Sequence, residues 1–346
     1  MKKISFLLVS IASKKYGFGH LNRSISLSKF IKKKHNSKFI TFTDDISQKK
    51  INRYNPNLLK NFIKILNYQM LEKFDFIIFD ISNHVILKDK KIIKYLEKIT
   101  YQFFNKIIII DGLKNEMINK NEKIKKKVLI CPYLIENNEV KKNDNKTKYL
   151  IGPNYFIPSH NMTKLKKNNI LKKDIKNLLI TCGGSDLECH SIYLVKILLE
   201  INIKIKINIV IGPFYSKKLI SLLEKVSQKN PNINLIYNPK NIWISMLKND
   251  VIICSSGLTK YETILLGLPL IIFCANKEQE KNNIGFKKKN ICITIDDMKK
   301  RSEIKKTIEN YLQNFNQRKK FLHKSEKIFD LNGAKRILKV IENLKN

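Results

Sequence analysis

The sequence predicts an α/β protein made of two Rossmann-like domains, each built on a parallel sheet. Short apolar runs alternate with amphipathic stretches along nearly the whole chain. The runs are continuously apolar, as in strands that helices cover on both faces. The 346 residues, 43% of them hydrophobic, are enough for two domains with sizeable cores.

The expected strands are distributed evenly over the two halves of the chain. In the first half they are Ile4–Ile11, Lys38–Thr43, Phe76–Asp80, Ile107–Asp111, Val128–Cys131 and Tyr149–Ile151. In the second half they are Asn177–Thr181, Lys206–Ile211, Asn234–Tyr237, Val251–Cys254, Leu270–Cys274 and Ile291–Ile295. Amphipathic stretches between them, such as His20–Lys34 and Lys90–Phe104, predict helices, and three more helices fill the C-terminal end.

A boundary between the domains is expected just beyond the middle strands. The polar stretch Lys141–Lys148 leads through one short strand into the Pro-dotted segment Gly152–Pro158, which is typical of a linker. We therefore expect an N-terminal domain over residues 1–160 and a C-terminal domain, including the C-terminal helices, over residues 161–346. Parallel α/β sheets bind ligands at the carboxyl ends of their strands, so the two domains are expected to face each other across a cleft.

The chain is strongly basic, with a formal net charge of +38. Nucleic-acid binding is one explanation of such a charge. Proteins that read bases favour Arg, however, and only five of the 67 basic residues are Arg, while the lysines are spread along the chain. We therefore expect no nucleic-acid partner. Compositional drift or attraction of a small anionic substrate explains the lysine excess equally well.

The cysteines and the N-terminus indicate the compartment. The six cysteines form no C-x-x-C pair, and several lie inside apolar runs. This pattern is typical of free thiols in a reducing compartment, so we expect a cytoplasmic protein without a zinc site. Residues 1–12 resemble a short signal peptide, but the Gly-rich turn that follows favours a first strand. No apolar run approaches the length of a membrane span.

The few glycines gather at turns between strands and helices. The first such turn, Gly17-Phe18-Gly19-His20, separates the first expected strand from the first helix. Glycines let a ligand approach the backbone closely, and a helix N-terminus offers N–H groups to an anion. His20 at the positive helix end is expected to stay neutral and to act as a general base. A tight turn with a surface histidine explains the same pattern without catalysis.

Two similar turns follow strands of the second half. The turn Gly183–Asp186 suits a bound ligand, or simply a helix cap made by Ser185 or Asp186. In the turn Ser256–Leu258, backbone N–H groups are candidates for binding a diphosphate.

Glu262, one turn into the helix after Ser256–Leu258, has two equally good explanations. Its carboxylate accepts hydrogen bonds from a ribose diol, or it folds back onto Thr259 in a capping box. Gln279, just beyond the next strand, completes the ligand edge expected for the second domain.

Taken together, the turns resemble those of GT-B-fold nucleotide-sugar enzymes, and in particular the UDP-sugar hydrolases of pseudaminic acid biosynthesis. Three motifs within residues 1–285 carry the resemblance: Gly-x-Gly-His followed by Arg23, Gly-Gly-Ser-Asp at 183–186, and Gly-x-Thr-x-Tyr-Glu at 257–262 followed by Leu-Gly-x-Pro. The resemblance implies a GT-B-like fold and hydrolysis of a UDP-linked amino or deoxy sugar, such as UDP-2,4-diacetamido-2,4,6-trideoxy-β-L-altropyranose. It implies neither a cofactor nor a metal.

By this resemblance His20 is the catalytic base that activates water. Together with the turns, it implies a set of substrate-binding residues: Gly17, Gly19, Arg23, Gly183, Gly184, Ser185, Asp186, Ser256, Gly257, Leu258, Thr259, Glu262 and Gln279. The chain departs from the family pattern, which usually has Tyr, a second acid, Trp and Asn where this chain has Ser82, Gly112, Tyr261 and Glu278. These departures leave the attached sugar open, and His84 is a candidate replacement group near Asp80.

Two other functions stay open at this point. Sister enzymes on the same fold, such as the peptidoglycan N-acetylglucosaminyltransferase, share the donor site but use a sugar acceptor. A UDP-sugar glycosyltransferase is therefore the first alternative. A non-catalytic basic binding protein is the second. The sequence does not decide the oligomeric state.

Overall fold

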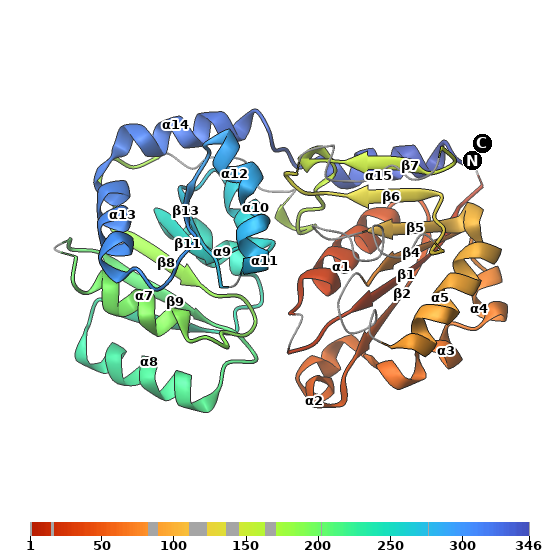
Figure 1. Ribbon diagram of the computed structural model, residues 1–346, viewed down its shortest axis with the longest axis horizontal. Coiled ribbons are helices and arrows are strands. Elements are labelled where there is room, and N and C mark those ends of the chain that lie inside the picture. Colours follow the sequence, from red (N-terminus) through yellow and green to blue (C-terminus); the bar gives the residue numbers. More distant parts are fainter. Residues whose placement is uncertain are drawn as a thin grey trace. The chain divides into compact units, whose positions relative to one another are not determined.

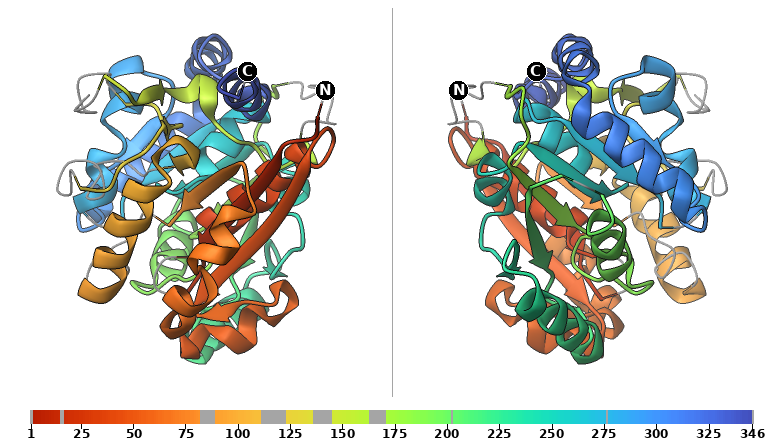
Figure 2. Two further views of the ribbon diagram at one scale, coloured as in Figure 1. Left: turned by 90° about the vertical axis from the view of Figure 1, so that its right-hand side faces the viewer. Right: turned by 90° about the vertical axis from the view of Figure 1, so that its left-hand side faces the viewer.

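The computed structural model describes residues 2–14, 17–81, 89–110, 123–135, 145–162, 171–201, 203–275 and 277–345 (Figure 1). The chain divides into two compact units. Unit 1 contains Met1–Lys164 and Asp330–Asn346, and unit 2 contains Leu165–Phe329. Each unit has its own sheet, and the strands of both sheets are twisted (Figure 2).

Unit 1 is built on a sheet whose strands are all parallel. Within the described residues it has seven strands in the order β3-β2-β1-β4-β5-β6-β7. The strands are β1 (Ser5–Ile11), β2 (Asn36–Thr43), β3 (Asn57–Leu58), β4 (Phe76–Asp80), β5 (Ile107–Ile110), β6 (Val128–Cys131) and β7 (Lys148–Ile151).

Helices cover both faces of this sheet. Helices α1 (Gly19–Ile31) and α15 (Gly333–Glu342) share one buried cluster with alternate side chains of β1, β4, β5, β6 and β7. The intervening side chains point to the opposite face, because successive residues of a strand alternate. Figure 1 shows α5 on that opposite side. The remaining described α-helices of unit 1 are α2 (Asp45–Gln48), α3 (Phe62–Ile65), α4 (Tyr68–Glu72) and α5 (Lys90–Gln102).

Helix α15 corrects the expected domain division. The sequence assigned all C-terminal helices to the second domain, but α15 belongs to unit 1. A Cβ on Gly333 would lie 1.9 Å from the carbonyl oxygen of Phe156, so the close approach of α15 requires glycine. Lys345 Nζ lies 2.5 Å from Asp75 Oδ1, and the two chain ends lie together on unit 1 (Figure 1). An amphipathic pattern predicts a helix, but it does not identify the sheet that buries its apolar face.

Unit 2 repeats the parallel architecture. In the part of the chain described here it has six strands in the order β10-β9-β8-β11-β12-β13. The strands are β8 (Asn177–Thr181), β9 (Lys206–Ile211), β10 (Ile233–Tyr237), β11 (Val251–Ser255), β12 (Leu270–Phe273) and β13 (Ile293–Ile295).

The helices of unit 2 lie between these strands and after them. They are α7 (His190–Leu198), α8 (Lys217–Lys229), α9 (Ile242–Leu247), α10 (Thr259–Leu265), α11 (Lys277–Lys281), α12 (Ile284–Lys289), α13 (Arg301–Gln313) and α14 (Phe315–Glu326). Side chains of α7, α8 and α13 join one large buried cluster with alternate residues of β8, β9 and β11. Among the described helices, none is both long and apolar enough to cross a membrane.

The predicted fold class is confirmed, since every expected strand is present in one of the two parallel sheets. The two-residue strand β3 was not predicted, because so short an edge strand leaves no hydrophobic pattern. The last residue of the expected strand Ile107–Asp111 lies outside the described residues, and so does part of the polar stretch Lys141–Lys148.

Candidate functional site

In unit 1 the strand order reverses between β1 and β4, because β2 lies on one side of β1 and β4 on the other. Open parallel sheets bind their ligands beyond the carboxyl ends of the strands at such a reversal. The turn after β1, the first turns of α1 and the end of β4 meet there. Asp80, the last residue of β4, pairs in register with Ser10 of β1.

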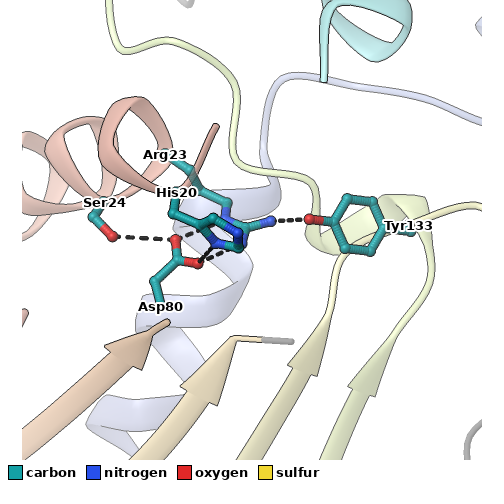
Figure 3. Close-up of polar contacts among 5 residues, drawn as sticks. All are labelled: His20, Arg23, Ser24, Asp80 and Tyr133. Atoms are coloured by element: carbon teal, nitrogen blue, oxygen red, sulfur yellow. Dashed lines mark hydrogen bonds and ion pairs between the residues drawn. The ribbon is translucent and has the colours of Figure 1, made fainter. Parts of the chain in front are cut away.

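Asp80 is the centre of a polar cluster at this edge (Figure 3). Its Oδ1 lies 2.6 Å from His20 Nδ1, and its Oδ2 lies 2.8 Å from Arg23 Nε and 3.1 Å from Ser24 Oγ. Arg23 also donates to Asp80 Oδ1 and to the hydroxyl of Tyr133, which follows β6. His20, Arg23 and Ser24 reach the same carboxylate because positions three and four apart share one face of α1.

The Asp80 carboxylate determines which nitrogen of His20 carries the proton. An ionised carboxylate only accepts hydrogen bonds, so Nδ1 of His20 donates, and in the neutral ring Nε2 keeps its lone pair. The His20 side chain is 17% exposed, whereas that of Asp80 is fully buried. Nε2 is therefore the basic atom that this pair presents at the sheet edge.

The charges in the cluster compensate one another. Burial alone would raise the pKa of Asp80, but the Arg23 guanidinium and His20 outweigh it and hold the pKa at about 2. Burial likewise opposes the charge of Arg23, yet the Asp80 carboxylate raises the Arg23 pKa above its ordinary value. Burial raises the pKa of Tyr133, so this hydroxyl stays neutral. Asp80 and Arg23 consequently form a permanent ion pair beneath His20.

Arg23 was predicted to contact substrate, but the structure places it below the surface. Its side chain is almost completely buried, and its donors are directed at Asp80 and Tyr133. We therefore assign Arg23 a positioning role in place of a substrate contact. The sequence did not identify Tyr133 as a site residue, and the only signal for it was its place just after an apolar strand.

Gly17 closes the turn between β1 and α1. It adopts a φ of +70° and donates from its backbone N–H to the carbonyl oxygen of Ser13 at 2.7 Å. A Cβ there would meet no atom within 4 Å, so backbone conformation rather than packing requires the glycine. Gly19 begins α1, whose first turn presents N–H groups at the same edge. Substrate binding by Gly17 and Gly19 stays a prediction.

In unit 2 the strand order reverses between β8 and β11, and the two predicted turns of this unit meet there. A Cβ on Gly183, whose φ is +81°, would lie 3.8 Å from Ser255 Oγ. Gly212, which follows β9, also joins this edge. A Cβ on Gly212 would lie 2.5 Å from the carbonyl oxygens of both Gly183 and Gly184. Gly212 was not predicted as a site residue, although it stands directly after an expected strand.

Asp186 caps helix α7 rather than facing a ligand. Its two carboxylate oxygens accept from the backbone N–H groups of His190 and Ser191, each at 2.8 Å. Burial acts to raise the pKa of Asp186, but side-chain and backbone hydrogen bonds from His190 and Ser191 outweigh it and lower the pKa. The cap explanation therefore holds for Asp186. Ser185 lies partly exposed beside it, next to Gly183 and Gly184.

In the turn Ser256–Leu258, predicted to bind a diphosphate, only some of the backbone N–H groups are available to a ligand. Ser256 N–H donates to the carbonyl oxygen of Phe273 at 3.2 Å, and Gly257 N–H donates to that of Ser255 at 2.7 Å. The prediction that these two N–H groups bind an anion is therefore wrong, because both are occupied within the protein. Leu258 precedes the first residue of α10, where helix geometry leaves N–H groups without intrahelical partners.

Glu262 is not part of a capping box. Helix α10 begins at Thr259 without a hydrogen bond from a capping side chain. Glu262 is partly exposed, and desolvation raises the pKa of its carboxyl group to about 7. Gln279 is engaged elsewhere, since its Oε1 accepts from the backbone N–H of Ala275 at 2.9 Å. Ligand contact by Glu262 stays a prediction.

Several sequence positions cannot be placed. Ser82, His84, Asp111 and Gly112 lie outside the described residues. Within the described ranges, no group of three or more His, Cys, Asp or Glu side chains is arranged to hold a metal ion.

No protein-family model matches the sequence. Among curated proteins, Uncharacterized protein MJ1062 of Methanocaldococcus jannaschii is 30% identical over 285 residues. The aligned part covers 79% of this chain but only 56% of that protein. The chain therefore corresponds to little more than half the length of this relative.

Solved structures of similar fold extend over the whole chain. MurG of Acinetobacter baumannii matches with a TM-score of 0.66 and 12% identity, covering 98% of this chain and 99% of its own. A complex of S. aureus MnaA with UDP matches with a TM-score of 0.63 and 10% identity, covering 99% and 97%. The spinosyn rhamnosyltransferase SpnG matches with a TM-score of 0.60 and 8% identity, covering 98% and 100%. Two parallel α/β units and these neighbours define the class: the chain has the GT-B fold.

Proposed function

We propose that the protein is a glycosyltransferase that uses a UDP-sugar donor. The observation that carries this proposal is the His20–Asp80 pair at the strand reversal of unit 1, which places a basic Nε2 at the sheet edge. The fold supports it, since neighbours of similar fold include a rhamnosyltransferase and a protein that binds UDP.

In this proposal unit 2 holds the nucleotide. Glu262 accepts hydrogen bonds from the ribose hydroxyls as a carboxylate. Gly183, Gly184 and Ser185 bring backbone close to the ligand at the strand reversal. Thr259 and Leu258 contribute backbone N–H groups at the start of α10. The resemblance to UDP-sugar enzymes supports these assignments.

Unit 1 supplies the general base. His20 Nε2 takes the proton of an acceptor hydroxyl as the acceptor oxygen forms a bond to the anomeric carbon. The bond from that carbon to the diphosphate oxygen breaks, and UDP leaves with the electron pair. Asp80 stabilises the imidazolium that forms and keeps the ring oriented. A base positioned in this way contributes roughly 10²–10⁴ in rate.

Hydrolysis of the UDP-sugar is the second candidate. The observation that favours it is the Gly17-x-Gly19-His20 turn, which resembles that of UDP-sugar hydrolases. Water then takes the place of the acceptor hydroxyl, and the same His20 nitrogen takes its proton. The expected products are UDP and the free sugar.

Release of UDP from defined donors tests both candidates. The purified chain is incubated with UDP-N-acetylglucosamine, UDP-glucose and UDP-linked diacetamido sugars, with and without an extract of lipid-linked and soluble saccharide acceptors. Release of UDP that requires acceptor supports transfer, whereas release with water alone supports hydrolysis. If the chain neither binds UDP nor releases it under any of these conditions, the proposed function is wrong.

A further inference from the structure

A buried lysine lies beneath the ligand edge of unit 2, and the function proposed above does not use it. Lys260, in the first turn of α10, is 1% exposed. Its Nζ donates to Ser256 Oγ at 2.9 Å, to Asn283 Oδ1 at 2.9 Å and to the carbonyl oxygen of Asn282 at 3.0 Å. An ammonium group has three N–H donors, so this arrangement satisfies its protonated form completely.

The three acceptors are neutral, and no carboxylate pairs with Lys260 among the residues that the structure describes. The Phe286 ring, whose centroid lies 4.5 Å from Nζ, and the Tyr261 ring at 5.4 Å complete the surroundings. Aromatic rings attract a cation but do not neutralise it. Burying the Lys260 ammonium group without a counter-ion costs free energy. Packing of the core does not require a charge at this position.

Lys260 is coupled directly to the turn at the strand reversal. Ser256 Oγ lies 2.5 Å from Asn283 Oδ1, so the lysine, the serine and the asparagine form one closed network. Asn283 Nδ2 in turn donates to Cys274 Sγ at 3.1 Å. The ammonium group thus stands one hydrogen bond from the turn that follows β11, at the edge where Gly183 meets Ser255.

We propose that Lys260 is a positioning and specificity-determining residue whose buried positive charge selects an anionic nucleotide over a neutral nucleoside at this edge. The inference rests on the proposed binding of UDP by unit 2. The ammonium group holds the turn through Ser256 and Asn283, and its field attracts the diphosphate without touching it. One unit charge at roughly 10 Å, with an effective dielectric constant of about 20, changes anion affinity by about tenfold.

The thiol groups around Lys260 stay neutral over the pH range of this titration. Burial lowers the Lys260 pKa to about 8, and the thiols of Cys254, Cys274 and Cys292 are the ionisable groups that face it. Burial raises the pKa of Cys274 and of Cys292 to about 12, and that of Cys254 further still. Asp296 lies beyond Cys274, with Oδ1 3.6 Å from the thiol, and Glu262, whose pKa burial raises to about 7, acts on Cys254. Loss of the Lys260 proton is therefore the event that weakens anion binding above about pH 8.

Calorimetric titration of UDP and uridine into the full chain between pH 7 and pH 9 tests this role. Uridine carries the same base and ribose, so titration of the base affects both ligands alike. We expect UDP affinity to fall about tenfold relative to uridine affinity as pH rises through 8, with proton uptake on binding of UDP but not of uridine. Ionisation of Glu262 near pH 7 acts on both ligands alike, because both carry the ribose. In Lys260→Met, UDP binds about tenfold more weakly at pH 7, the alkaline decrease disappears and uridine affinity is unchanged.

Lys287→Met is the matched control, since Lys287 pairs with Asp296 on the partly exposed α12 and should leave UDP affinity as it is. A native chain whose UDP affinity relative to uridine affinity is level from pH 7 to 9 without proton uptake overturns the proposal, and this measurement needs no variant. Equal loss of UDP and uridine affinity in Lys260→Met also overturns it, because that result indicates a purely structural role. UDP binding with the expected pH dependence but without turnover leaves the role of Lys260 intact and removes the proposed function. A native chain that binds no UDP removes both.

Discussion

Asp80 and Glu262 both lie at the strand reversal of a parallel sheet, one in each unit, yet their pKa values move in opposite directions. Burial opposes ionisation at both positions. At Asp80 burial is outweighed by Arg23 and His20 together and the pKa is about 2, whereas at Glu262 desolvation acts alone and the pKa rises to about 7. The repeated architecture therefore determines the position of each carboxyl group. The charged groups around a carboxyl group determine its pKa, and so whether it is ionised.

The same contrast holds for the cations. Arg23 in unit 1 has Asp80 as its counter-ion, while Lys260 in unit 2 has only neutral acceptors. Unit 1 has a closed ion pair beneath His20, whereas the Lys260 ammonium group of unit 2 has no counter-ion among the described residues. Removal of a charge should consequently harm chemistry in unit 1 and binding in unit 2.

The largest effect is expected from Asp80→Asn. The variant removes the negative charge beneath His20 and adds an amide donor that can bind Nδ1 and select the wrong tautomer, and it leaves Arg23 buried without a counter-ion. Turnover should fall by about 10³–10⁴, and the free energy of unfolding should decrease by about 3–5 kcal/mol. Steady-state kinetics and denaturant unfolding measure the two losses. Asp75→Asn, just before the opposite end of β4, is the control and should keep the native turnover. An Asp80→Asn variant with native turnover and stability would contradict the role of the Asp80 charge in unit 1.

His20→Ala should lower turnover by about 10²–10⁴ with little change in UDP affinity, because the nucleotide is assigned to the other unit. Single-turnover kinetics and calorimetric titration with UDP separate the two effects. The exposed His323 on α14 supplies the matched variant, and His323→Ala should behave as the native chain. Near-normal turnover by a folded His20→Ala would reject the general base.

The free energy of unfolding should depend on pH in the acid range because of Asp80. Its pKa is about 2 in the folded chain, below the ordinary value of about 3.9, so the ionised form stabilises the fold above pH 4. This contribution, about 2–3 kcal/mol, is lost as pH falls from 4 towards 2. Unfolding measured over this range should show the difference between the native chain and Asp80→Asn shrinking. A difference that stays constant with pH would contradict the ion pair.

Glu262→Gln should weaken UDP binding roughly tenfold at pH 8, because a carboxylate that accepts ribose hydroxyls is lost. The native affinity should rise with pH through about 7 as Glu262 ionises, and the variant should lack this rise. Its stability should not decrease at pH 8, since the folded chain disfavours the ionised carboxyl there. A capping box predicts instead a stability loss of about 0.5–2 kcal/mol with UDP affinity intact.

The smallest effect is expected from Gly212→Ala. The new Cβ would lie 2.5 Å from two carbonyl oxygens of the Gly183-Gly184 turn, so the turn must move, at a cost of roughly 1–3 kcal/mol in stability. UDP affinity should fall several-fold, as measured by titration. Gly257→Ala introduces a Cβ with no atom within 4 Å and provides the comparison. Equal behaviour of the two variants would show that the turn is not fixed by Gly212.

Residues of the candidate site could be predicted from the sequence only where they lie in or just after a Gly-containing turn between a strand and a helix. His20 and Glu262 follow Gly-containing turns and were identified. Asp186 was left between ligand and cap, because a cap is decided by which backbone N–H groups lie nearby. Tyr133 follows an apolar strand and Lys260 lies within a motif, but neither position indicates the role of the side chain, since these roles come from partners 110 and up to 23 residues away along the chain.

Hydrophobic periodicity by itself determined the strands and their parallel pairing, because a strand covered on both faces must be continuously apolar, whatever its partners. The sequence also determined which turns lie at the carboxyl edges, since every strand in a parallel sheet points the same way. Only the tertiary structure decided that the Arg23 side chain binds Asp80 in the interior and that α15 packs on unit 1. It also decided that the backbone N–H groups of Ser256 and Gly257 donate to carbonyl oxygens of the protein itself. These outcomes depend on distances between residues far apart in the chain, and hydrogen bonding and burial respond to those distances rather than to sequence order.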